Sequence, residues 1–234
     1  MKMTTLKSVA IAVGLASSAF GQATSPVVGY ETINLSASFN FIGVRLHEQP
    51  VATGTLEAIN TDSVEDTGVD FAALLDDATT YILEIEDEEG IIVELLGTAG
   101  GAAGVLDTNF DLAAAGVADG VSYSLRPAST LLSIFGGATD GGLTSGTSAA
   151  ASDQILLSNG SGGFDTYFIL TSGGFGGSSQ DWVQLNADSS TTEIDPASIP
   201  IVYTDGIIVN AVGCLLYTSP SPRDLSTSRM PSSA

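Results

Sequence analysis

Short runs in which apolar and polar residues alternate recur from residue 28 to residue 210, and each run ends near Gly, Asp, Asn or Ser. Alternation with a period of two is typical of half-buried strands, and these breakers are typical of the turns between strands. The clearest example is residues 81–86 and 91–96, which predict a hairpin around the acidic turn 87–90. The chain is therefore predicted to be all-β and β-sandwich-like.

The same alternation predicts further strands over residues 28–35, 39–46, 53–59, 121–126, 154–157, 164–170, 182–185, 199–203 and 206–210. A few single helical turns are predicted over residues 71–77, 111–115 and 129–135, the last of them capped by Ser129. These helical turns are too short to be stable without tertiary contacts.

The 234 residues are enough to bury one sizeable core or two small ones. Residues 22–213 are predicted to form one β-rich domain. Within it, residues 136–152 consist mainly of Gly, Ser, Thr and Ala, which predicts a flexible loop or a join between subdomains.

Residues 1–21 have the features of a secretory signal peptide. Lys2 and Lys7 provide a positive start, residues 9–16 are apolar, and Ala19 and Gly21 are small residues at the positions that a signal peptidase recognises. Cleavage after Ala23 is the alternative. The apolar run is far shorter than the ~20 residues of a spanning helix, so the sequence predicts export to the periplasm, the cell surface or the medium.

Residues 214–234 differ abruptly in composition from the rest of the chain, with several Ser and Pro residues and no periodic apolar pattern. This segment resembles the translation of a sequencing-adapter scar, and a natural disordered tail is the alternative. We therefore predict that residues 214–234, with the only cysteine, Cys214, are a non-native tail. If a final strand is missing, residues 22–213 alone are expected to expose an unpaired edge and to aggregate.

The charge is strongly one-sided. Residues 22–213 contain 26 of the 27 acidic residues but only two basic ones, Arg45 and Arg126. So acidic a domain repels phosphate backbones and anionic membranes, which argues against nucleic acid as a partner. No segment after the signal peptide is long and apolar enough to be a transmembrane helix.

Most reactive chemistries lack the residues they need. His47 is the only histidine and is expected to lie in an exposed turn, and residues 22–213 contain no cysteine, so a zinc, iron–sulfur or haem-thiolate site is excluded. The Gly-rich segments lack the lysine of a phosphate-binding loop, and residues 160–163 predict a hairpin loop instead. We predict that the protein is not an enzyme and has no catalytic, cofactor-binding or metal-binding residues, with a carboxylate-only hydrolase as a minor alternative.

No cofactor is predicted, but calcium is the one ion whose oxygen ligands are abundant. The candidate clusters are Asp62, Glu65, Asp66 and Asp70; Asp76 and Asp77; and residues 86–89. None has the spacing of an EF-hand loop. The alternative is a solvated acidic face that keeps a β-rich protein soluble.

Aromatic residues suggest a second alternative, a carbohydrate-binding surface. Trp182, which follows a Gly-rich loop, is the best candidate for an exposed stacking ring. The other aromatic residues considered for such a surface are Tyr30, Tyr123, Phe164, Tyr167, Phe168 and Phe175. About half of the residues in an alternating strand point inward and aromatic residues favour cores, so core packing is the expectation for most of this set.

Several packing motifs occur in a characteristic order, namely residues 26–33, 121–136 and 151–157, followed by Tyr167, Phe168 and Trp182. In these motifs the chain resembles an uncharacterised family of secreted, strand-rich proteins that is often present as many paralogues in Verrucomicrobia-type bacteria. The resemblance implies no catalytic or binding residue, and it implies that the native chain continues beyond residues 206–210.

Together these features predict an exported, non-enzymatic envelope or extracellular protein with a structural or adhesive role. The alternative is a carbohydrate-binding module, with or without calcium. The expected partner is therefore a polysaccharide or another component of the envelope.

Overall fold

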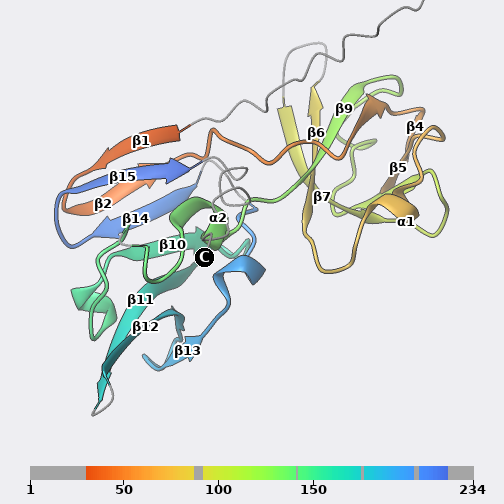
Figure 1. The fold of residues 1–234 in the computed structure, drawn as a ribbon. Helices are drawn as coiled ribbons and strands as arrows, with labels where there is room; N and C mark the ends of the chain where they lie inside the picture. Colours follow the sequence, from red (N-terminus) through yellow and green to blue (C-terminus); the bar gives the residue numbers. More distant parts are fainter. Residues whose placement is uncertain (1–29, 87–91, 141, 175–176, 203–205, 221–234) are drawn as a thin grey trace, which may run out of the picture.

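The computed structural model describes residues 30–86, 92–140, 142–174, 177–202 and 206–220, and the predicted signal peptide, the 87–90 turn and residues 221–234 lie outside these ranges. Strands make up 43% of the structure and helices 9%, which confirms the all-β, sandwich-like class. Figure 1 shows two lobes side by side. We call residues 30–46 and 128–220 the main lobe and residues 51–127 the insertion lobe.

The main lobe is built on a six-stranded antiparallel sheet. Its order is β13 (Thr191–Glu193), β12 (Gly177–Leu185), β11 (Phe164–Gly174), β10 (Gln154–Ser158), β14 (Ile207–Ala211) and β2 (Ser38–Ile42). One face of this sheet carries the core, including Ile155, Tyr167, Trp182 and Ile207. As predicted, β10 and β11 form a hairpin, whose loop contains Gly160 and Gly162 at positive φ.

A second layer covers this core. It consists of the two-stranded pair β1 (Tyr30–Leu35) and β15 (Leu215–Pro220), together with α2 (Leu131–Phe135). The pairing of β1 with β15 continues that of β2 with β14, since Leu35 faces Leu215 and Ser38 faces Ala211. The two ladders are thus one long ribbon, bent at residues 36–37 and 212–214.

The strand β15 lies inside the segment that we predicted to be a non-native tail. The structure describes residues 215–220 as the pairing partner of β1, and the origin of this segment stays a prediction. A chain that stops at Gly213 would lose this partner, which is why we expect it to expose the edge of β1.

The bend in the ribbon holds Ser38 at a φ of 92°, a left-handed conformation that costs a non-glycine residue about 1–2 kcal/mol. The Asn40 side chain braces this bend, because its Nδ2 donates to the carbonyls of Ser36 and Ser38, both at 2.8 Å.

We therefore expect Ser38→Gly to raise the free energy of unfolding by about 0.5 kcal/mol, since relief of strain exceeds the added entropy of the unfolded chain. Urea unfolding measures this change. Ser36→Gly is the control, because Ser36 is not among the residues with positive φ, and it is expected to lower stability. A Ser38→Gly variant less stable than the parent would contradict the assignment of strain.

The insertion lobe contains a seven-stranded antiparallel sheet. Its order is β3 (Ala52–Thr55), β9 (Ser122–Pro127), β6 (Tyr81–Glu86), β7 (Ile92–Ala99), β8 (Val105–Thr108), β5 (Ser63–Glu65) and β4 (Ala58–Ile59). The predicted hairpin of β6 and β7 is confirmed. The sheet surrounds a second core, which includes Leu56, Leu83 and Phe71 of α1 (Phe71–Leu74).

The two ends of this sheet belong to one segment. Only Leu56 and Glu57 separate β3 from β4; the Leu56 amide donates to Val121 and the Glu57 amide donates to Glu65. The sheet therefore curls until its first and last strands adjoin. Residues 53–59, predicted as one strand, are split between these two pairings.

The chain leaves the main lobe after residue 46, enters the insertion lobe at residue 51 and returns to the main lobe at residue 128. Residues 136–152, which we predicted as a flexible loop or a subdomain join, lie in the main lobe and contain the short helix η1 (Ala149–Ala151). There Gly146 bridges Leu170, and the Gly136 carbonyl accepts a hydrogen bond from Trp182.

Two local predictions were wrong. Thr130, not Ser129, caps α2, because Thr130 forms a reciprocal capping box with Ser133. Residues 199–202 form no strand. Pro200 instead forms an isolated β-bridge with Thr130, next to η2 (Pro196–Ser198). Proline has no N–H to donate to a ladder, so this segment follows the entry to α2 instead.

Candidate functional site

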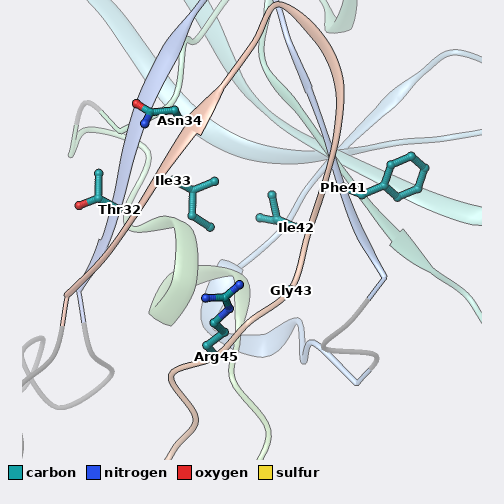
Figure 2. A pocket seen from close by; sticks show the side chains of 7 residues that line it. All are labelled: Thr32, Ile33, Asn34, Phe41, Ile42, Gly43 and Arg45. Atoms are coloured by element: carbon teal, nitrogen blue, oxygen red, sulfur yellow. The ribbon is translucent and has the colours of Figure 1, made fainter.

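A cavity of about 570 Å³ opens between β1 and the end of β2. Figure 2 shows Ile33 and Ile42 directed toward this space, with Asn34 and Arg45 around it. Ile42 belongs to the main core, and Ile33 packs against that core. The cavity is therefore an opening at one edge of the main lobe, where the two layers part.

Phe41 also borders the cavity, but its ring points away from Ile33 and Ile42 (Figure 2). Phe41 is 78% exposed and Phe39 is 62% exposed. Both residues lie on the outer face of β2, opposite the face that Ile42 contributes to the core. Two exposed phenylalanines on one short strand are unusual for a surface that meets only water.

The neighbouring strands contribute little to this exposed surface. Phe41 lies directly opposite Ile208 of β14, which is buried, and Ile208 lies opposite the half-buried Leu156 of β10. We call the exposed residues Phe39 and Phe41 the β2 face. It lies at the edge of the six-stranded sheet, because β2 pairs with β14 alone in that sheet.

The charge of the chain is low around this surface. Residues 32–47, 154–164 and 206–220 contain no acidic residue, although the whole chain has a net charge of −21. Arg45, which is exposed, is the one charged residue in these three segments. The β2 face is thus an uncharged area on a strongly acidic protein.

Three aspartates in the calcium candidates, Asp66, Asp70 and Asp76, accept hydrogen bonds from main-chain amides, and Asp66 and Asp76 also accept one from a tyrosine hydroxyl. Asp70 accepts from the Ala73 amide at the start of α1, and Asp76 accepts from the amides of Ala78 and Thr79. Further turns are held in this way by Asp111, Asp140, Asp188 and Asp195. Among the residues that the structure describes, no group of three or more His, Cys, Asp or Glu side chains is placed to hold a metal ion.

Asp66, from the first calcium cluster, is buried in the insertion lobe. It accepts hydrogen bonds from the Tyr123 hydroxyl at 2.8 Å and from the Gly68 amide at 2.9 Å. A Cβ atom on Gly54 would stand 2.6 Å from an Asp66 oxygen, so glycine is needed there. Burial, and then the nearby Asp66 carboxylate, raise the pKa of Tyr123 above its ordinary value, which keeps the hydroxyl a donor.

Hydrogen bonds hold the pKa of Asp76 below its ordinary value of 3.8, first from the Thr79 side chain and then from the Tyr81 hydroxyl, while desolvation opposes them. A depressed pKa in the folded state adds stability above pH 3.8, and this stability is lost as the pH falls through the folded-state pKa. We expect thermal unfolding of Asp76→Asn to depend less on pH below this value than that of the parent.

Asp77→Asn is the control for this measurement, because Asp77 is the exposed neighbour of Asp76. Its pH profile is expected to follow that of the parent. Parallel profiles for the parent and Asp76→Asn would show that the hydrogen bonds to Asp76 do not favour folding.

Trp182 does not form an exposed stacking surface, so that interpretation was wrong. Its side chain is 2% exposed, it packs in the main core, and its Nε1 donates to the Gly136 carbonyl at 3.1 Å. The alternation in β12 placed Trp182 on the inner face. The expectation of core packing is confirmed for Tyr123, Tyr167 and Phe168.

Of the remaining residues singled out by sequence, Phe175 and the side chain of Tyr30 lie outside the described part of the structure. His47 is exposed, as expected, in the crossing between the lobes. Phe164, another of the aromatic residues considered, is 48% exposed on β11. The exposure of Phe39 and Phe41 was not predicted, because the adjacent apolar residues Phe41 and Ile42 leave the inner face of the strand ambiguous.

Comparison with protein-family models, with curated proteins and with solved structures finds no match to this chain. Within the described ranges, no helix has the length and apolar character needed to cross a membrane.

Proposed function

We propose that the protein is an exported, non-enzymatic protein of the envelope or extracellular space with a structural or adhesive role, and that it makes contact through the β2 face. The observation that carries this proposal is the exposure of Phe39 and Phe41 on one face of an edge strand. Exposed aromatic rings in an uncharged area are typical of surfaces that bind a partner.

The structural part of the proposal is supported by how the acidic side chains are used. Asp66 and Asp153 are buried and bonded to main-chain amides, and exposed aspartates cap turns. Carboxylates used in this way stabilise loops, which suits a protein that presents a rigid surface. The N-terminal segment supports export.

A carbohydrate-binding module is the second candidate, and one observation favours it. Phe39 and Phe41 lie two residues apart on the same face of β2, where sugar rings could stack on them. In this candidate the stacking rings are Phe39 and Phe41, because Trp182 is buried.

Pull-down of the purified protein with cell-envelope fractions and with a panel of insoluble polysaccharides tests the proposal. We expect the parent to bind envelope material and the double variant Phe39→Ser/Phe41→Ser to lose most of that binding. Phe110→Ser is the matched control, because Phe110 is 50% exposed in the insertion lobe. Binding to a pure polysaccharide that needs both rings would favour the carbohydrate-binding module, and binding that neither ring affects would refute both candidates.

Export has its own test. N-terminal sequencing of the protein recovered outside the cytoplasm of a bacterial host is expected to begin at Gln22, or at Thr24 for the alternative cleavage site. Retention in the cytoplasm with an intact N-terminus would refute the exported role.

A further inference from the structure

The β2 edge differs from the other edges of the six- and seven-stranded sheets in the described part of the chain. In the insertion lobe, the end strands β3 and β4 adjoin, so that sheet closes on itself. At the far end of the main sheet, β13 is three residues long and carries the exposed Glu193. Short strands and charges are common ways to prevent edge-to-edge pairing, and β2 has five residues and no charge.

The sequence of β2 is also compatible with pairing to itself. In an antiparallel pair centred on Asn40, Phe39 of each copy lies opposite Phe41 of the other, and Ser38 lies opposite Ile42. Because Phe39 and Phe41 lie on the same outer face, this register brings four rings together around a two-fold axis.

The charge distribution is compatible with a second copy at this edge. Two molecules of net charge −21 repel each other wherever their acidic surfaces meet. The segments around β2, residues 32–47, 154–164 and 206–220, have no acidic residue, so contact here keeps the acidic surfaces of the two copies apart.

We propose that the protein forms a two-fold symmetric dimer in which the β2 strands of two copies pair antiparallel and bring Phe39 and Phe41 of both copies together on one outer face. The dimer joins the two six-stranded sheets into one continuous sheet. This inference rests on the proposed function in that it states how the same contact surface is assembled, from the rings of two copies of this chain.

Sedimentation equilibrium of the purified protein from about 1 μM to about 1 mM tests the dimer. We expect a monomer–dimer equilibrium that tightens as NaCl rises from ~0.05 to ~0.5 M, because salt screens the repulsion between acidic copies. Phe39→Ser/Phe41→Ser should weaken it about tenfold or more, and Phe110→Ser should leave it unchanged. A parent that stays monomeric throughout, or a dimer that tolerates the double variant, would overturn the inference.

Disulfide trapping tests the register and does not depend on removing both rings. In a Cys214→Ser background, the variants Phe39→Cys and Phe41→Cys are purified separately and then mixed. The mixture should cross-link faster than either variant alone, because directly opposite Cβ atoms lie ~5 Å apart and diagonal ones ~7–8 Å. Equal rates in all three samples would refute the two-fold pairing.

The two proposals can fail separately. Envelope binding by a protein that remains monomeric would refute the dimer and leave the proposed function standing. A dimer that binds no envelope material would support the inference and argue against adhesion as its role.

Discussion

Asp153→Asn is expected to lower the free energy of unfolding by about 2–4 kcal/mol, although the two side chains have nearly the same volume. The Asp153 side chain is 1% exposed, and its two oxygens accept hydrogen bonds from the amides of Thr144, at 2.7 Å, and Val212, at 2.8 Å. Asparagine has only one acceptor oxygen, so its NH₂ group would face one of these amides donor to donor.

This effect is expected to be large because Asp153 connects two distant parts of the main lobe. Thr144 lies in the Gly-rich loop, and Val212 lies at the bend of the ribbon between β14 and β15. Urea unfolding followed by the emission of Trp182, the only tryptophan, measures the change. Asp77→Asn, the same replacement at an exposed position, should change stability by less than about 0.5 kcal/mol. Equal effects of the two variants would contradict this role for Asp153.

Glu84→Gln is expected to destabilise the protein by about 2–3 kcal/mol. Arg126 is 1% exposed, and its Nε donates to Glu84 Oε1 at 2.6 Å, whereas Glu84 is 23% exposed. The replacement keeps an acceptor oxygen but removes the negative charge beside a buried guanidinium. Less ion pairing then offsets the desolvation of the guanidinium.

Arg126→Met tests whether the destabilisation of Glu84→Gln comes from the lost negative charge or from the lost contact between the two side chains. Methionine fills a similar volume without charge, and the remaining Glu84 carboxylate reaches solvent, so we expect a loss of about 1 kcal/mol or less. Thermal and urea unfolding of both variants measure the difference. A larger loss for Arg126→Met than for Glu84→Gln would show that the guanidinium contributes more through its other contacts than it costs in desolvation.

The sequence predicted the local structure well where short-range chemistry decides it. The alternation in residues 81–86 and 91–96 predicted the β6–β7 hairpin, and the glycines of residues 160–163 predicted the β10–β11 loop. The end of β2 at Ile42, four residues before the predicted end, was not predictable from alternation. There the chain leaves the sheet to enter the insertion lobe, and no local pattern marks that crossing.

The candidate site was not predictable, because it depends on which face of a strand becomes the inner one. Phe39 and Phe41 alternate as regularly as the core residues of other strands, yet the pairing of Ile42 with Ile207 turns their rings outward. A shift of one residue in that register would bury both rings and expose Ile42. The same dependence on register explains why Trp182, the expected exposed ring, is in the core.

The sequence by itself determined the all-β class, most strand positions and the turns, because these depend on the period of alternation and on residues two to four apart. Only the tertiary structure decided the two lobes, the bent ribbon and the exposed β2 face. These features depend on partners far apart in the chain, such as Asp153 with Val212 across 59 positions and Trp182 with Gly136 across 46. Such contacts form only when the strands are paired in the correct order and register, and this pairing depends on the packing of the whole core.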